Sequence, residues 1–351
     1  MKLFYVLDYV SGYGGVETVI SDVIKKLISN GQKVFVLLSY PSENNKWEET
    51  LPNVYYYSSK DVCNETYLID RAIGLAETMS ELPSPDVIIT THVPATTLFA
   101  KIAIGSRSNI PIISWLHNPF FSDGLRYANF HWCISHEIEH KLSQMRIENL
   151  KLKYIGNPIS LGVENIMPII GNQYVYIGRL ENKQKRINLL FKTLSMLNFN
   201  WKLNIYGDGP DRRWLTNLAK MLKIDKQVIF HGWRRNPWNE IEKISALVLT
   251  SDFEGLPMVV LEALARGIPV ISTDSGGTSD LIINEKNGYL VEKNNPEKLK
   301  EAFEKFNFLN ENELIKMSQE AKESTQQFST DAVVNRMLES ISLLTGKQGG
   351  K

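Results

Sequence analysis

The most constraining stretch of the sequence runs from residue 247 to residue 277 and reads LVLTSDFEGLPMVVLEALARGIPVISTDSGG. Two short apolar runs, Leu247–Thr250 and Ile268–Ser272, are typical of buried strands. The residues between them predict a helix over Met258–Arg266, with Pro257 at its first position. The stretch is therefore predicted to form a strand, a loop, a helix and a second strand, which is the unit from which parallel sheets are built.

Two glutamates stand out in this stretch. The predicted helix is apolar on almost every side and should be buried, so the carboxylate of Glu262 needs a polar partner to offset its desolvation. Glu254 lies in the loop before the helix. A glycosidase pair would have its carboxyl groups about 5 to 9.5 Å apart across one bond, and these two positions need not face a common bond. The spacing fits two separate hydrogen-bonding roles on one extended ligand better, with N–H groups at the helix start available for hydroxyls or phosphate.

Strands and helices alternate along most of the chain. A strand over Leu3–Leu7 precedes a helix over Val16–Ser29, and the alternation restarts at Tyr174–Ile177 after the irregular segment Gly156–Gly171. A shorter helix is predicted over Pro237–Lys243. The pattern predicts an α/β protein of two doubly wound Rossmann-like domains that face each other across a ligand cleft. We expect the domains at 1–160 and 161–330, a helix over 331–345 that crosses back to the N-terminal domain, and a disordered tail over 346–351.

Composition limits the function classes. The 351 residues include 39 Lys+Arg and 39 Asp+Glu, so the chain has no net charge that would recruit nucleic acid. Two cysteines do not make a disulfide framework, and the sequence shows neither a signal peptide nor an apolar run of about 18 residues. We therefore expect a cytoplasmic protein, at most peripheral to a membrane. Phe120–Phe121 and the basic segment Lys141–Lys153 predict either a membrane-contacting patch or a solvated helix with one buried face.

Several loops have the composition of phosphate-binding sites. Gly14-Gly15 lies between a predicted strand and helix, and the turn Gly207–Pro210 follows another strand. Each turn is as consistent with a plain tight turn as with a phosphate site. Arg179 and Lys185 follow a third strand and are able to hold a diphosphate, although a solvated loop would be basic too. Because the sequence contains no D-x-D, we expect no metal on such a diphosphate.

The segment His136-Glu137-Ile138-Glu139-His140 matches the zinc-protease pattern H-E-x-x-H. In a zinc protease this motif lies within a helix, whereas here Ser135 ends a predicted strand and is placed to cap the next helix. His136 and Glu137 would then occupy the exposed first turn of that helix. We therefore do not expect a zinc site.

Taken together, these motifs carry a resemblance to a known family. The glutamates Glu254 and Glu262 occur in E-G-L-P-M-V-V-L-E-A, together with Gly178-Arg179-Leu180, Lys185, Gly14-Gly15, Gly207–Pro210 and Gly276-Gly277 in the same order. This set resembles the E-x7-E signature and glycine loops of retaining glycosyltransferases of the family 4 type. The resemblance covers essentially the whole chain and implies a GT-B fold with a C-terminal donor domain and an N-terminal acceptor domain.

The resemblance implies a role for each site residue. The diphosphate of a nucleotide sugar would be held by Arg179 and Lys185, the ribose by Glu262, and the donor sugar by Glu254 and the amides after it. His117 matches the family position near the reacting centre and, with Glu254, Arg179 and Lys185, is expected to be catalytic. The remaining expected contacts of the nucleotide sugar are Gly14, Gly15, Gly207, Gly232, Trp233, Gly255, Leu256, Pro257 and Met258.

Within the family, three segments resemble enzymes that use UDP-galactose in lipopolysaccharide core synthesis: Ser11–Ser21, Gln184–Arg186, and His231-Gly232-Trp233 with Asn236-Pro237-Trp238. The implied activity is retaining, metal-independent transfer of a hexose, galactose, from a UDP-sugar to a sugar hydroxyl of a lipid-linked or cell-surface glycan, with no cofactor. Two alternatives stay open, a nucleotide-sugar epimerase of similar fold and a non-catalytic nucleotide- or glycan-binding protein.

Overall fold

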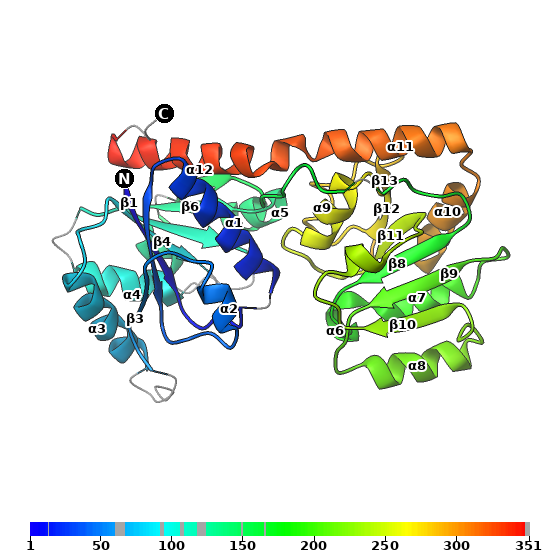
Figure 1. Ribbon diagram of the computed structural model, residues 1–351, viewed down its shortest axis with the longest axis horizontal. Helices are drawn as coiled ribbons and strands as arrows, with labels where there is room; N and C mark the ends of the chain where they lie inside the picture. Colours follow the sequence, from blue (N-terminus) through cyan, green and yellow to red (C-terminus); the bar gives the residue numbers. More distant parts are fainter. Residues whose placement is uncertain are drawn as a thin grey trace. The chain divides into compact units, whose positions relative to one another are not determined.

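The computed structural model describes residues 1–12, 14–59, 67–91, 95–105, 109–117, 124–148, 150–164 and 166–347. The chain folds into two compact units (Figure 1). Unit 1 consists of Met1–Pro158 together with Phe328–Lys351, and unit 2 is Ile159–Gln327. The chain therefore leaves unit 1 near the segment that we expected to be a linker and returns to it for the last helix.

Unit 1 is built on a seven-stranded parallel sheet, sheet 1, in the order β3-β2-β1-β4-β5-β6-β7. Its strands are β1 (Lys2–Leu7), β2 (Lys33–Leu38), β3 (Val54–Tyr56), β4 (Val87–Thr91), β5 (Ile112–Leu116), β6 (Phe130–Cys133) and β7 (Leu152–Tyr154). The described helices are α1 (Gly15–Ser29), α2 (Asn45–Glu48), α3 (Tyr67–Ser80), α4 (Ala95–Ile104), η1 (Leu125–Tyr127), α5 (His136–Ser143) and α12 (Thr330–Thr345). The strand order reverses between β1 and β4, which is where doubly wound sheets bind ligands.

Helix α12 belongs to unit 1, where it packs beside α1 (Figure 1). The indole Nε1 of Trp132 donates to Ser340 Oγ at 2.7 Å, and the guanidinium of Arg336 donates to the carbonyl of Ile155. Of the tail that we expected to be disordered from residue 346, the structure describes the first two residues. Gly346 ends α12 in the left-handed conformation, and Lys347 forms an ion pair with Asp86. The rest of that predicted tail, 348–351, lies outside the described residues.

Unit 2 has a six-stranded parallel sheet, sheet 2, in the order β10-β9-β8-β11-β12-β13. Counted within the unit this is the Rossmann order, 3-2-1-4-5-6. The strands are β8 (Gln173–Ile177), β9 (Lys202–Tyr206), β10 (Val228–Gly232), β11 (Ala246–Leu249), β12 (Val270–Thr273) and β13 (Gly288–Val291). The helices are α6 (Asn182–Lys185), α7 (Ile187–Leu194), α8 (Arg212–Met221), η2 (Pro237–Glu240), α9 (Met258–Ala265), α10 (Pro296–Asn307), α11 (Glu311–Ser324) and η3 (Gln326–Phe328).

The stretch 247–277 forms the predicted strand, loop, helix and strand, as β11, α9 and β12. Pro257 is not the first helical residue, because its extended backbone places it just before the helix as the N-cap. The helix predicted over Pro237–Lys243 is a single 3₁₀ turn. It stops at Glu240 because the buried Ile241 takes an extended conformation on the way to β11.

Among the described residues, no helix combines the length and the apolar composition that crossing a bilayer requires.

Candidate active site

The loops that follow the strands of sheet 2 are joined to one another at the carboxyl edge of the sheet. Gly178 N–H donates to Tyr206 O at 3.0 Å, and Gly207 N–H donates to Gly232 O at 2.9 Å. The close approach requires glycine, because a Cβ on Gly207 would lie 1.9 Å from Gly178 O. The N–H of Gly207 is thus engaged within the protein. Its predicted contact with a ligand stays a prediction.

The same construction recurs between the loops after β11 and β12. A Cβ on Gly277 would lie 2.0 Å from Gly255 O, and Glu254 N–H donates to Ser275 O at 2.9 Å. Gly276-Gly277, which formed part of the family resemblance, therefore allows the loop after β12 to pack closely against the loop that bears Glu254.

Lys185 and Glu254 form an ion pair beside the point where the order of sheet 2 reverses. Lys185 Nζ lies 2.6 Å from Glu254 Oε1, and Ser251 Oγ donates to the same oxygen at 2.6 Å. The side chains of the pair are only 20% and 12% exposed. Thr250 Oγ1 donates to the Lys185 carbonyl at 3.1 Å, which ties the two loops together. Within the described chain, Glu254 Oε2 accepts no hydrogen bond, so one oxygen is held and the other is available to a ligand.

Glu262 has the polar partner that its position on an apolar helix required. Trp238 Nε1 donates to Glu262 Oε2 at 2.7 Å. Burial raises the pKa of Glu262, and the hydrogen bond from Trp238 and the charge of Arg266 act in the opposite direction. Glu254 and Glu262 therefore have different partners, in agreement with the separate roles that their spacing indicated.

Helix α9 begins next to the Glu254 loop. Gly255 and Met258 are partly exposed, whereas Leu256 and Pro257 are buried. The first N–H groups of an α-helix have no partner within the helix, and they carry the positive end of its dipole. This helix start is therefore suited to bind an anion or hydroxyls.

Arg179 and Trp233 lie on the same edge but are far more exposed. The Arg179 side chain is 69% exposed and pairs with Glu181 at 3.6 Å, so its predicted contact with the diphosphate stays a prediction. Trp233 is 61% exposed and follows Gly232, whose backbone is in the left-handed region. A flat exposed ring beside a binding edge is suited to stack on a planar ligand.

The glycine-rich loop of unit 1 is organised by a residue that we did not predict, Glu17. Its Oε1 accepts hydrogen bonds from the backbone N–H and hydroxyl of Ser11 and from Gly12 N–H, at 3.0 to 3.2 Å. A Cβ on Gly14 would meet Glu17 Oε2 at 2.4 Å. Gly14 is the N-cap of α1 and Gly15 its first residue, so both lie at a helix start, as predicted.

His117 directly follows β5 at the carboxyl edge of sheet 1. Its ring centroid is 4.8 Å from that of the buried Trp115. Asn118 and Pro119, which completed the motif in the sequence, lie outside the described residues, as does Phe120–Phe121. The catalytic role of His117 stays a prediction.

The H-E-x-x-H segment, residues 136–140, lies at the start of α5, directly after the N-cap Ser135. Ser135 Oγ accepts from Ile138 N–H at 3.3 Å and caps α5, and His136 is exposed in the first turn, stacked on Tyr154 at 4.0 Å. Across the described ranges, no group of three or more His, Cys, Asp or Glu side chains is placed to hold a metal ion.

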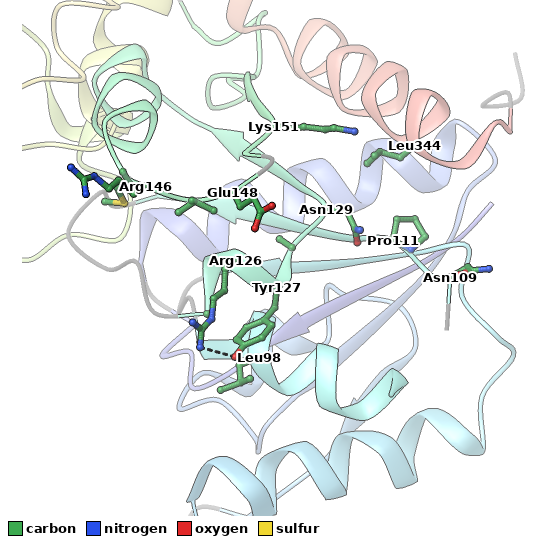
Figure 2. Close-up of a pocket in the computed structure, with 14 residues that line it drawn as sticks. Leu98, Asn109, Pro111, Arg126, Tyr127, Asn129, Arg146, Glu148, Lys151 and Leu344 are labelled. Carbon is green, nitrogen blue, oxygen red and sulfur yellow. Dashed lines mark hydrogen bonds between the residues drawn. The ribbon is translucent and has the colours of Figure 1, made fainter. Parts of the chain in front are cut away.

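A groove of about 1380 Å³ opens in unit 1 at the opposite edge of sheet 1 (Figure 2). Pro111, Asn129 and Lys151, which immediately precede β5, β6 and β7, line it, so it lies at the amino ends of these strands. Arg126 and Arg146 add two more cations, and Arg126 donates to Tyr127 Oη at 2.9 Å. The residues described around the groove include none that we predicted for the donor.

Comparison with known proteins identifies the family. A model of Glycosyl transferases group 1 matches residues 171–326, and a model of Glycosyltransferase Family 4 matches residues 13–161. The lipopolysaccharide 1,6-galactosyltransferase of Escherichia coli K12 is 31% identical over 309 residues, which cover 83% of this chain and 85% of that protein. The chain belongs to the family 4 glycosyltransferases. The relative of the same name from Salmonella typhimurium LT2 matches this glycosyltransferase with the same identity, 31%, and the same coverage, 83% and 85%.

Solved structures agree with this membership. The lipopolysaccharide outer core galactosyltransferase WaaB in its apo form has a TM-score of 0.85 at 26% identity, over 97% of this chain and 99% of that one. Anabaena HepE in complex with UDP-glucose shares the fold, with a TM-score of 0.80 at 19% identity over 98% and 100% of the chains. The predicted fold, two Rossmann-like domains of GT-B type, is confirmed. The matches support glycosyl transfer and give no support to the epimerase or to the non-catalytic alternative.

Three residues of the two edges were not predicted as site residues: Glu17, Trp238 and Ser251. Glu17 carried a signal, since a glutamate at the third helical position after a turn is placed to reach back to that turn. Trp238 belonged to the Asn236-Pro237-Trp238 part of the resemblance, but no local pattern marked its contact with Glu262 or that of Ser251 with Glu254.

Proposed function

We propose that this glycosyltransferase moves a hexose, galactose, from UDP-galactose to a sugar hydroxyl of a lipid-linked or cell-surface glycan, with retention at the anomeric carbon. Two relatives that share 31% of its residues are named lipopolysaccharide 1,6-galactosyltransferase. The observation that carries the proposal is the arrangement of Glu254 and Glu262, each with one oxygen held by the protein and one left for a ligand. Glu254 then binds the donor sugar, and Glu262 binds the ribose.

The diphosphate is the leaving group, and its charge grows as the bond to the sugar breaks. Lys185, Arg179 and the start of α9 supply positive charge and N–H donors for it, without a metal ion or other cofactor. Gly14, Gly15 and His117 act from unit 1 in this proposal. Because Lys185 and Ser251 both bind Glu254, its carboxylate is a weak nucleophile, and we favour attack of the acceptor on the face that the diphosphate leaves over a covalent intermediate.

Substitution of single lysine residues tests the assignment of Lys185 to the diphosphate. Lys185→Ala should lower kcat about 100-fold or more, because a charge that stabilises the leaving group is lost. Lys183→Ala is the matched control in the same short helix, since Lys183 is exposed and has no such position. Near-normal turnover of the Lys185 variant, at unchanged thermal unfolding, would refute its role.

The reaction itself is tested with a panel of UDP-galactose, UDP-glucose and UDP-N-acetylhexosamines and a lipopolysaccharide acceptor. We expect preferred use of UDP-galactose, an α-configured product by NMR and equal rates with and without a chelator. An inverted product would refute retention, and loss of activity with chelator would refute metal independence. Turnover of the UDP-sugar to its epimer without acceptor would restore the epimerase hypothesis.

We also propose that the enzyme contacts a membrane surface from the cytoplasmic side through the groove of unit 1. Arg126, Arg146 and Lys151 line it beside one carboxylate, Glu148. Arg146 and Lys151 belong to the basic segment Lys141–Lys153 that we predicted, and Arg126 lies outside it. In the same segment Lys141 pairs with Glu137 at 2.9 Å and Lys153 with Glu339 at 3.4 Å, so their charges are balanced locally.

Vesicle sedimentation tests this contact. Binding to vesicles of phosphatidylglycerol should exceed binding to phosphatidylcholine and should fall in the variant R126Q/R146Q/K151Q. The variant K141Q/K153Q is the matched control. Equal loss in both variants would show that general charge, and not the groove, is responsible.

A further inference from the structure

Trp238 occupies an unusual place for a large aromatic residue. It lies in η2, the single turn that connects β10 to β11, and is only 6% exposed. Its indole N–H is directed to a carboxylate and not to a backbone carbonyl, with Nε1 at 2.7 Å from Glu262 Oε2. A hydrogen bond to an ionised acceptor is among the stronger ones in proteins.

Arg266 holds the same indole from its face. The guanidinium carbon lies 4.8 Å from the Trp238 ring centroid, and Nη1 donates to the Glu262 carbonyl at 2.9 Å. Arg266 follows α9 directly, one turn after Glu262. The ring of Trp238 is therefore fixed by a cation on its face and by a hydrogen bond at its edge, and both contacts involve residues of α9 or its C-cap.

These contacts determine the orientation of the Glu262 carboxylate. Oε2 is occupied by Trp238, and Oε1 accepts no hydrogen bond from the described residues. The carboxylate is thus held in one orientation with one oxygen available. Burial raises the pKa of Glu262, and the hydrogen bond from Trp238 and the charge of Arg266 act against that rise. The charge of Arg266 lowers the pKa of Glu262, and the charges of Glu262 and Glu164 raise the pKa of Arg266.

We propose that Trp238 is a positioning residue for nucleotide binding, which orients the carboxylate of Glu262 toward the ribose hydroxyls. The inference rests on the proposed role of Glu262 in the donor site. Trp238 itself does not touch the nucleotide in this arrangement. A residue that only filled space at this position would need no N–H, and phenylalanine would serve as well.

The substitution Trp238→Phe removes the donor and keeps the ring. We expect UDP affinity, measured by titration calorimetry, to fall about tenfold at neutral pH, because the carboxylate loses a charge-assisted hydrogen bond. The loss of UDP affinity in acid should begin at higher pH than in the wild type, since the hydrogen bond that favours the ionised form is absent. Trp238→His keeps a ring N–H and should retain more affinity than the phenylalanine variant. Trp214→Phe, on the exposed side of α8, is the matched control and should change neither quantity.

A double-mutant cycle separates positioning from packing. If Trp238 acts through Glu262, the variant W238F/E262A should bind UDP no more weakly than Glu262→Ala alone. Additive losses, or wild-type affinity in both Trp238 variants, would overturn the inference. If Glu262→Ala leaves UDP binding unchanged, the proposed role of Glu262 fails instead, and the two failures are thereby distinguished.

Discussion

Gly207→Ala should weaken nucleotide binding as well as stability, because this residue lies where two loops of unit 2 touch. Gly207 has φ of 150°, and a Cβ there would lie 1.9 Å from Gly178 O, whereas real contacts of this kind are longer than 3.0 Å. The carbonyl must therefore move by more than an ångström. The strained backbone and the overpacking together should cost about 2 to 6 kcal/mol of the free energy of unfolding.

The displacement should reach the predicted diphosphate site. Gly178 precedes Arg179, and Leu180 N–H donates to Asp208 O at 2.9 Å, so the loop that leads to α6 and Lys185 moves with it. A misplacement of about 1 Å is able to lower a catalysed rate about 100-fold. We expect a loss of this order in kcat/KM, and a clear loss of UDP affinity by calorimetry.

Gly171→Ala is the matched control for this experiment. Gly171 also has a left-handed φ, 129°, but a Cβ there has nothing within 4 Å. This variant should show only the cost of backbone strain, about 1 to 3 kcal/mol in denaturant unfolding, with normal UDP binding. Equal UDP affinity in both variants would refute the reasoning from loop contact.

Three further predictions concern buried groups. Burial lowers the pKa of His131 to about 4, so only the unfolded chain takes up this proton between pH 6.5 and 4. Stability should therefore fall by about 3 kcal/mol as pH drops through that window, and His131→Gln should flatten this dependence in denaturant titrations; an unchanged slope would contradict it. Trp132→Phe breaks the bond to Ser340 and should cost about 1 kcal/mol. Trp115→Phe should lower the free energy of unfolding by less, because Trp115 Nε1 has no hydrogen-bond partner in the described ranges. Thermal unfolding of both variants checks this difference. Ser251→Ala removes one of two donors to Glu254 and should lower kcat/KM about tenfold, with UDP affinity nearly unchanged; a loss confined to UDP binding would place Glu254 on the nucleotide instead.

The alternation of strands and helices was predictable because each element carries its own periodicity. The apolar runs of β11 and β12 and the helix between them could be read from 31 consecutive residues, without any knowledge of their neighbours. Pro237–Lys243 shows the limit of this reasoning. Its local composition favours a helix, but the burial of Ile241 draws the chain into an extended path after one turn.

The sequence marks candidate site residues, but it does not indicate which of them are in contact with one another. Glu262 on an apolar helix required a partner, yet nothing near it in the sequence pointed to Trp238, 24 residues away. Lys185 and Glu254 are 69 residues apart and meet only because β8 and β11 are neighbours in the sheet. Such pairings depend on strand order, which a single sequence does not specify.

The return of the chain to unit 1 has a consequence for its synthesis. Residues 159–327 of unit 2 are continuous, so a ribosome completes them before the last helix of unit 1 exists. Until then the surface that α12 covers with Val333, Val334, Met337 and Ile341 is exposed to water, and the indole of Trp132 lacks Ser340. Unit 1 is thus the first part to be made and the last to be finished. A fragment that ends at residue 327 should therefore be prone to aggregation through this uncovered face. The segment 159–327, by contrast, contains all of unit 2 in one continuous stretch.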